Sequence, residues 1–245
     1  MENKGMPERE EVTVCGKKCV IRQTGSAERI YLWAYHDFSG DEFDGLLSKL
    51  RKVPEAEDCV IAAFEISDWD AELSPWEAPQ AFGTRPFAGK GPETLRWLLE
   101  GYLPYLKKRF PEAESFYTMG YSLAGLFALW ALYETDQFAG CVCCSGSLWI
   151  DGWDAYAASH GLKRESYVYL SLGGKEEKTE NPLMKRVGDR TREQERLLSE
   201  DPNAGGSILF WNRGGHFADA SERLSRGILW MQGQKRFIIS GKAEL

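Results

Sequence analysis

Residues 115–133 read SFYTMGYSLAGLFALWALY, and this stretch constrains the fold more than any other part of the chain. Its first residues, 115–120, carry aromatic and β-branched side chains that favour a strand. The residues after Ser122 are apolar on nearly every side, which is typical of a buried helix. A strand that turns sharply into a fully buried helix needs a sheet to cover that helix. The stretch therefore predicts a layered α/β protein.

Strands and helices are predicted on both sides of this stretch. Apolar and alternating patterns predict strands at 11–15, 18–23, 29–35, 59–66, 140–146, 166–173 and 207–212. Helical periodicity is found at 91–110, 154–161, 181–200 and 217–233. The first two strands should form an antiparallel hairpin, and the later alternation predicts a mostly parallel central sheet with helices on both faces. The length of 245 residues fits a single domain over 1–245.

Composition excludes several classes of partner. The chain has 43% hydrophobic residues and a net charge of -7, which argues against nucleic acid or an anionic membrane as the partner. The first residues, MENKGMPEREEVTV, contain no apolar stretch of the kind found in signal peptides. The longest apolar run, near 126–133, is too short to span a membrane. We expect a cytoplasmic protein without a membrane partner, and the oligomeric state stays open.

The six cysteines favour buried thiols over a metal site. Four of them lie in strand-like segments, where free cysteine behaves as a small apolar side chain: Cys59, Cys141, Cys143 and Cys144. Cys15 and Cys19 flank a predicted hairpin turn and could face each other. No CxxC pair occurs, so neither a metal nor a cofactor is predicted.

Ser122 lies in GYSLAG, between the predicted strand and the buried helix. In a strand–turn–helix of this kind the turn lifts the serine oxygen above the sheet edge. Glycine at 120 and 125 would let the turn close, and the N–H of Leu123 would meet an oxyanion at the helix N-terminus. The alternative is that Ser122 only caps the helix. We favour the nucleophile because a strand precedes the turn and a buried helix follows it.

A serine nucleophile needs a base, and the chain has three histidines. His216 follows the last predicted strand, His160 ends a helix, and His36 precedes the serine. Folds with such a serine turn place serine, acid and histidine in that order along the chain. Only His216 fits this order.

The acid should follow a strand between the serine and the histidine. Glu176 and Glu177 come directly after the strand at 166–173, and Glu176 is the first choice. Asp151 and Asp154 follow the preceding strand and are weaker alternatives. Both glutamates could instead be solvated loop charges.

Four motifs resemble the putative-esterase family of α/β-hydrolases: GYSLAG, CSGSLW, SLGGKEEKT and GGHF. The family includes esterase D-like and siderophore esterases, and SGSLW with the Gly-Lys-Glu-Glu loop looks closest to the siderophore-esterase branch. The resemblance implies an α/β-hydrolase fold with Ser122 as nucleophile, His216 as base and Glu176 as acid. It also implies a second oxyanion donor after the third strand. Here that loop reads YHDFSGDEF rather than His-Gly, so His36 or Asp37 would supply the backbone N–H, or His36 would contact substrate.

The substrate is predicted to be a small carboxylic ester, of siderophore type or aromatic. Trp69, Trp76 and Trp149 follow strands that end at the same sheet edge as Ser122, which predicts an aromatic pocket. Arg213 could meet an anionic group of the substrate. The sequence therefore indicates a serine hydrolase that forms an acyl-enzyme. An acyltransferase with the same residues and a non-catalytic binding protein are the alternatives.

Overall fold

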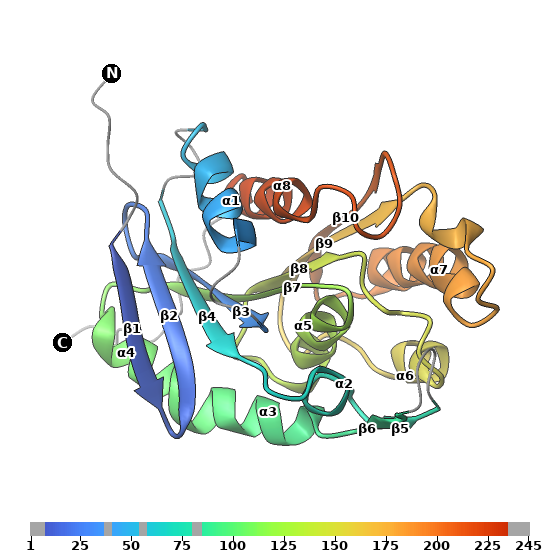
Figure 1. Ribbon diagram of the computed structural model, residues 1–245, viewed down its shortest axis with the longest axis horizontal. Helices are drawn as coiled ribbons and strands as arrows, with labels where there is room; N and C mark the ends of the chain where they lie inside the picture. The colour runs from blue at the N-terminus through green and yellow to red at the C-terminus, as the bar shows by residue number, and fades with distance from the viewer. Residues whose placement is uncertain (1–7, 37–40, 54–57, 80–84, 235–245) are drawn as a thin grey trace.

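An eight-stranded sheet runs through the centre of the protein (Figure 1). The computed structural model describes residues 8–36, 41–53, 58–79 and 85–234. The strand order is β1-β2-β4-β3-β7-β8-β9-β10. Their bounds are β1 Arg9–Val14, β2 Lys17–Gln23, β3 Arg29–Tyr35, β4 Val60–Glu65, β7 Ser115–Tyr121, β8 Gly140–Cys144, β9 Ser166–Gly173 and β10 Ala204–Asn212.

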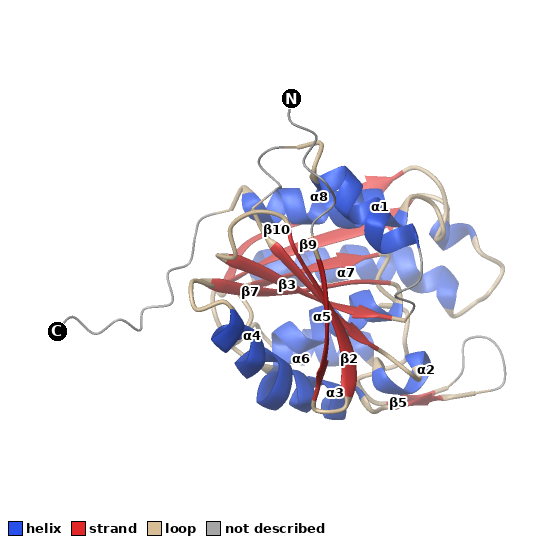
Figure 2. Cartoon of the chain, turned by 60° about the vertical axis from the view of Figure 1, so that its left-hand side comes forward, coloured by secondary structure: helices blue, strands red, loops and turns tan. Residues whose placement is uncertain are grey.

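The sheet is mostly parallel, as predicted. From β4 through β10 each neighbouring pair is parallel, while β1 with β2 and β2 with β4 are antiparallel. The hairpin turn between β1 and β2 is made by Cys15 and Gly16, both at positive φ. Figure 2 shows the twist of the sheet from this hairpin to β10. Parallel strands end at one edge, and that edge carries the site described below.

Helices cover both faces of the sheet and bury a separate apolar core on each (Figure 1). One face is covered by α1 (Asp41–Leu50) and α8 (Ala220–Gln232), which pack on each other. The other carries α3 (Gly91–Trp97), α4 (Leu103–Arg109), α5 (Leu123–Glu134), α6 (Trp153–Ser159) and α7 (Val187–Glu200). Residues 123–133 of α5 are all buried, as their apolar sequence predicts.

The predicted helix at 91–110 is interrupted. A π-helical turn, η2 (Leu98–Tyr102), separates α3 from α4. Pro104 lies in the first turn of α4 and has no N–H to donate to the preceding turn. The helical hydrogen-bond pattern therefore shifts before it.

Short elements form where no strand or helix is predicted, and one 3₁₀ turn occupies part of the helix predicted at 181–200, which as α7 begins only at Val187. These are α2 (Trp69–Glu72), the β5–β6 pair (Glu77–Ala78 and Phe87–Ala88), and two 3₁₀ turns, η3 (Glu176–Lys178) and η4 (Met184–Arg186). All six cysteines are free thiols, and of these only Cys15 is exposed. None of the helices in the described ranges is both long and apolar enough to cross a membrane.

Candidate active site

Ser122 lies in a tight turn between β7 and α5. Its backbone has φ 58° and ψ -125°, a conformation that costs about 1–3 kcal/mol for a residue with a side chain. The turn is held by Ser122 N–H donating to the Cys144 carbonyl (3.0 Å) and by Ser147 N–H donating to the Ser122 carbonyl (3.1 Å). The side chain makes no capping hydrogen bond to the helix. These main-chain hydrogen bonds therefore hold the strained backbone, and the Ser122 side chain does not cap the helix.

Gly120 is required for this turn to close. A Cβ at position 120 would lie 2.2 Å from the carbonyl oxygen of Ala124. A Cβ at Gly125 would lie 3.1 Å from the Cys144 carbonyl oxygen, where a small shift would be needed. The two glycines of GYSLAG thus allow α5 to begin directly against β7 and β8.

A chain of hydrogen bonds runs from Ser122 through His216 to Glu176. Ser122 Oγ lies 3.0 Å from His216 Nε2, and His216 Nδ1 lies 2.8 Å from Glu176 Oε2. Three segments far apart in sequence meet here: the β7–α5 turn, the 3₁₀ turn after β9, and the loop between β10 and α8. Because a carboxylate accepts, Nδ1 carries the proton, which leaves Nε2 of neutral His216 to accept from the serine hydroxyl.

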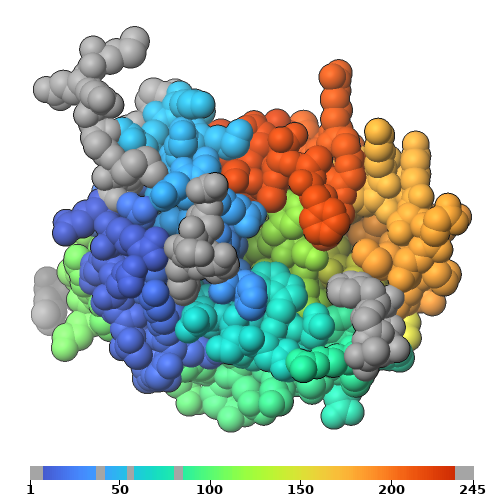
Figure 3. All heavy atoms as spheres, in the orientation of Figure 1, coloured from blue at the N-terminus to red at the C-terminus, as the bar shows by residue number. Residues whose placement is uncertain are grey.

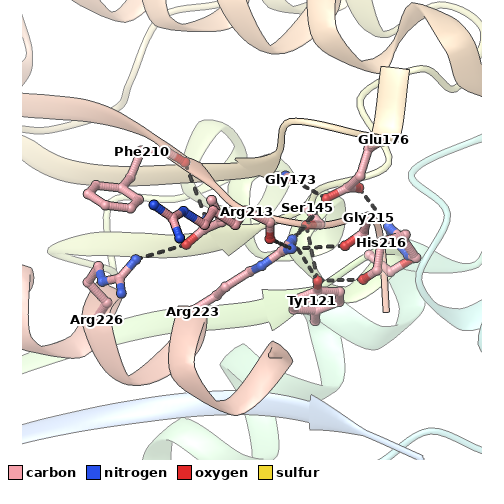
Figure 4. Close-up of polar contacts among 12 residues, drawn as sticks. Tyr121, Ser145, Gly173, Glu176, Phe210, Arg213, Gly215, His216, Arg223 and Arg226 are labelled. Atoms are coloured by element: carbon pink, nitrogen blue, oxygen red, sulfur yellow. Dashed lines mark hydrogen bonds and ion pairs between the residues drawn. The ribbon is translucent and has the colours of Figure 1, made fainter. Parts of the chain in front are cut away.

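Glu176 is buried in a shell of donors (Figure 4). Its Oε1 accepts from Ser145 Oγ (2.7 Å), Gly173 N–H (2.7 Å) and Arg223 Nη1 (2.9 Å). Burial alone would raise the pKa of the carboxyl, but hydrogen bonds from His216, Ser145 and Gly173 outweigh it and hold the pKa below its ordinary value. Glu176 is therefore a carboxylate at neutral pH.

Arg223, Tyr121 and Ser145 belong to this network, and sequence reasoning missed all three. Arg223 is only 1% exposed and reaches the site from α8. It donates to the Tyr121 hydroxyl (2.9 Å) and to Ser145 Oγ (2.7 Å), and Tyr121 donates to the His216 carbonyl (2.6 Å). Ser145 adopts φ 47° at the end of β8. Ser145 and Tyr121 had a signal in the sequence, because they lie in the CSGSLW and GYSLAG motifs, whereas Arg223 lies in none of the four motifs.

The alternative acids and the other histidines lie elsewhere. Glu177 pairs with Arg192, with Oε2 2.9 Å from Nη2. Asp151 and Asp154 form ion pairs with arginines of η4 and α7. His160 stacks on a neighbouring tyrosine, with ring centroids 4.1 Å apart.

Two cavities meet at Ser122 and His216. The first, of about 450 Å³, is called the His36 cavity; Trp33, Tyr35, His36, Glu42 and Tyr121 are among its walls. The second, of about 260 Å³, is called the Trp149 cavity; Asp70, Phe87, Leu123, Trp149 and Met184 are among its walls. Both are lined by Trp69 and by Phe217, which is 96% exposed. Figure 3 shows this face of the molecule, where the green atoms of the central segment lie between the cyan and orange parts of the chain.

The predicted contact residues divide between the cavities and their surroundings. Trp69, Trp149 and His36 line the cavities. Trp76 lines neither, because its indole N–H donates to the Asp151 carbonyl (2.7 Å) and its ring packs on other aromatic side chains. Arg213 is exposed and also lies outside both cavities.

His36 lies at the end of β3, edge-on to Trp69, with ring centroids 6.1 Å apart. Its Nδ1 lies 3.1 Å from the Ile66 carbonyl, which can only accept, so Nδ1 carries a proton. The other nitrogen of the neutral ring is then an acceptor. Asp37, the other residue considered for the second oxyanion donor, lies outside the described residues.

Solved structures with the same fold are siderophore and enterobactin esterases among others. The siderophore hydrolase EstA from Aspergillus nidulans is 18% identical with a TM-score of 0.67, covering 92% of this chain and 93% of that chain. An IroE-like serine hydrolase from Shewanella oneidensis is 14% identical with a TM-score of 0.77, covering 91% and 80%. The enterobactin esterase FES from Shigella flexneri is 17% identical with a TM-score of 0.63, covering 92% of this chain and 61% of that longer chain.

The comparison with protein families is more specific. No curated protein sequence matches the chain. The model of the family described as "Putative esterase" matches residues 42–216, well over half of the chain and the whole segment that carries Ser122, Glu176 and His216. With the mostly parallel sheet and the serine turn after β7, the match leads to one conclusion: the chain belongs to the "Putative esterase" family and is a serine esterase of the α/β-hydrolase fold.

Proposed function

We propose that the protein hydrolyses a carboxylic ester through an acyl-enzyme in which Ser122 is the nucleophile. His216 takes the hydroxyl proton as Ser122 attacks the carbonyl carbon, and then returns it to the leaving alcohol. A water molecule, activated by His216 in the same way, then attacks the acyl-enzyme, which releases the carboxylic acid and restores Ser122. The observation that carries the proposal is the hydrogen-bond chain, with Ser122 Oγ 3.0 Å from His216 Nε2 and His216 Nδ1 2.8 Å from Glu176.

The oxyanion of each tetrahedral intermediate is assigned to the N-terminus of α5. The Leu123 N–H is the first donor there, in a wall of the Trp149 cavity, and the helix dipole adds favourable charge. We place the second donor at the backbone N–H of His36, across the His36 cavity. The imidazole Nε2 of His36 is then available to accept from the substrate.

The expected test result is a covalent adduct. A fluorophosphonate probe should modify Ser122, located by mass spectrometry of the digested protein, because the probe reports an activated serine. The Ser122→Ala protein is the control and should carry no adduct. If the folded wild-type protein stayed unlabelled at mildly alkaline pH, that result would contradict the proposal and favour a binding protein. Product analysis with added alcohols separates hydrolysis from acyl transfer.

The walls of the two cavities suggest the substrate class. Aromatic side chains dominate both, which favours an aromatic ester, siderophore types included, as in the named neighbours. No lysine or arginine is found among the described residues of the walls, whereas Glu42 and Asp70 are acidic. We therefore propose a neutral or cationic ester.

We expect kcat/KM to fall when a matched ester series changes from cationic to neutral to anionic. An Asp70 carboxylate near the bound ester would discriminate by about fivefold for each unit of substrate charge, the size of a single charge pair in water, and added salt should reduce the difference. Asp70→Asn should reduce the difference in kcat/KM between the cationic and the anionic ester. Asp136→Asn makes the same change of net charge at an exposed site away from the cavities and should leave it intact. A preference for the anionic ester would contradict this substrate class.

A further inference from the structure

The guanidinium of Arg223 connects four separate parts of the site (Figure 4). Its Nη1 donates to Glu176 after β9, to Ser145 after β8 and to the Tyr121 hydroxyl on β7. Its Nη2 donates to the Gly215 carbonyl (2.9 Å), next to His216 in the histidine loop. We propose, building on the proposed function, that Arg223 is a positioning residue that fixes Glu176 and the loop of His216 in one arrangement and offsets the charge of Glu176.

Burial makes this arrangement rigid. Arg223 is 1% exposed, and the Glu176 side chain is 4% exposed. A planar guanidinium can bond in two directions at once, here to a carboxylate and to a backbone carbonyl. A lysine ammonium is a single point and cannot replace both contacts. Arg223 thus fixes the distance between the acid and the loop that carries the base.

Tyr121 binds the same loop through its hydroxyl group. Burial raises the pKa of Tyr121 to about 12, so its hydroxyl stays protonated at neutral pH. That proton is donated to the His216 carbonyl (2.6 Å), while the oxygen accepts from Arg223 (2.9 Å). The loop is therefore held at two neighbouring carbonyls, those of Gly215 and His216.

The charge of Arg223 also acts on His216. A carboxylate beside an imidazole favours the protonated ring, which cannot act as a base. Arg223 lies on the other oxygen of Glu176 and opposes this effect. The remaining charged and titratable groups that face His216 are at the cavity walls and on the neighbouring strand: His36, Glu42, Asp70 and Tyr121. Unlike these groups, Arg223 is a buried cation, and it contacts Glu176 directly.

Arg223→Met tests both parts of the proposal, because methionine fills similar space without charge or donors. We expect kcat to fall roughly 10- to 100-fold, the loss typical when a residue that hydrogen-bonds the ligands of a metal site is removed, with KM nearly unchanged. In the plot of kcat/KM against pH, the acidic limb of the variant should lie at higher pH than that of the wild type. A role in stability alone would alter neither kcat nor the limb in the fraction that stays folded.

Arg226→Met is the matched control. Arg226 lies one turn further along α8 and bonds Asn212 Oδ1 (2.8 Å) and Glu222 (3.4 Å), outside the network. Its kcat and pH profile should equal those of the wild type. Arg223→Lys separates charge from geometry, because lysine keeps the positive charge but cannot make both contacts of the guanidinium. The acidic limb should therefore stay near that of the wild type, while kcat stays low. If Arg223→Met fails to fold, wild-type kcat in Arg223→Lys would overturn the positioning role.

A measurement without substrate completes the test. The chain has three histidines, so ¹⁵N spectra of the imidazoles resolve His216 directly, assigned by its loss in His216→Gln. The titration midpoint of His216 should be higher in Arg223→Met than in the wild type. An equal midpoint together with unchanged kcat would overturn the proposal. If the wild type neither hydrolyses esters nor labels at Ser122, the proposed function fails, while the midpoints still decide the role of Arg223.

Discussion

Ser122→Ala is expected to lower kcat by about 10⁶-fold, the size of the loss when the serine of such a catalytic group is removed. No other described hydroxyl takes its place in the hydrogen-bond chain to His216 and Glu176. KM should change little, because the walls of the two cavities remain. The measurement is steady-state turnover of an aromatic ester by the wild type and the variant.

The variant should remain folded, which makes the result easy to interpret. Ser122 makes no capping hydrogen bond, so alanine removes none. The strained backbone at φ 58° is held by Cys144 and Ser147, whose bonds are to the main chain and persist. Unfolding by urea checks this point. Residual turnover near that of the wild type, in purified variant, would show that Ser122 is not the nucleophile.

The part of the site nearest the nucleophile could be predicted from sequence because its geometry is local. The GYSLAG turn needs glycine at 120, where a Cβ would lie 2.2 Å from a carbonyl oxygen, and such a need appears directly in the residues. The placement of His216 follows from chain order and from the parallel sheet, whose strands end at one edge. The mostly parallel sheet and its hairpin could be predicted from the periodicity of apolar residues, which is also a local property of the sequence.

The helix α1 was missed although its pattern is readable. Phe43, Leu46, Leu47 and Leu50 follow helical spacing and are all buried. Residues 35–43 are assigned from the sequence to the loop after the third strand, and no helix is predicted in the residues that follow. The hydrophobic spacing alone is therefore sufficient to predict α1.

Other contacts depend on tertiary packing and leave no trace in a single sequence. Arg223 lies in SERLSRG, where arginine is typical of a solvated helix face. In the structure it is buried between α8 and the sheet edge that carries the site. Trp76 and Arg213 were expected at the substrate, and the structure turns both outside the cavities. Glu176 and Glu177 are adjacent in one 3₁₀ turn, so only the direction of each side chain distinguishes them.

The difference in stability between the wild type and Glu176→Gln is expected to depend on pH, because only the wild type titrates at this position. The variant leaves the buried Arg223 without its counter-ion, and the removal of one partner of a buried pair costs about 3–5 kcal/mol. The pKa of Glu176 lies below its ordinary value of 4.5 in the folded protein, so folding favours the ionised form. The stabilisation is therefore complete above pH 4.5 and is lost as the pH falls through the lowered folded-state pKa. Urea unfolding of both proteins across this range should show the difference shrinking on acidification.

The effect of Glu176→Gln on catalysis should be larger still. We expect kcat to fall by about 10⁴-fold, because a neutral amide neither stabilises the imidazolium formed during attack nor fixes the proton on Nδ1 of His216. Glu177→Gln is the matched control, since Glu177 pairs with Arg192 at the surface, where an ion pair contributes about 0–1 kcal/mol. That variant should keep wild-type kcat. If Glu177→Gln lost activity and Glu176→Gln kept it, the 2.8 Å contact between Glu176 and His216 would not be the one that catalysis uses.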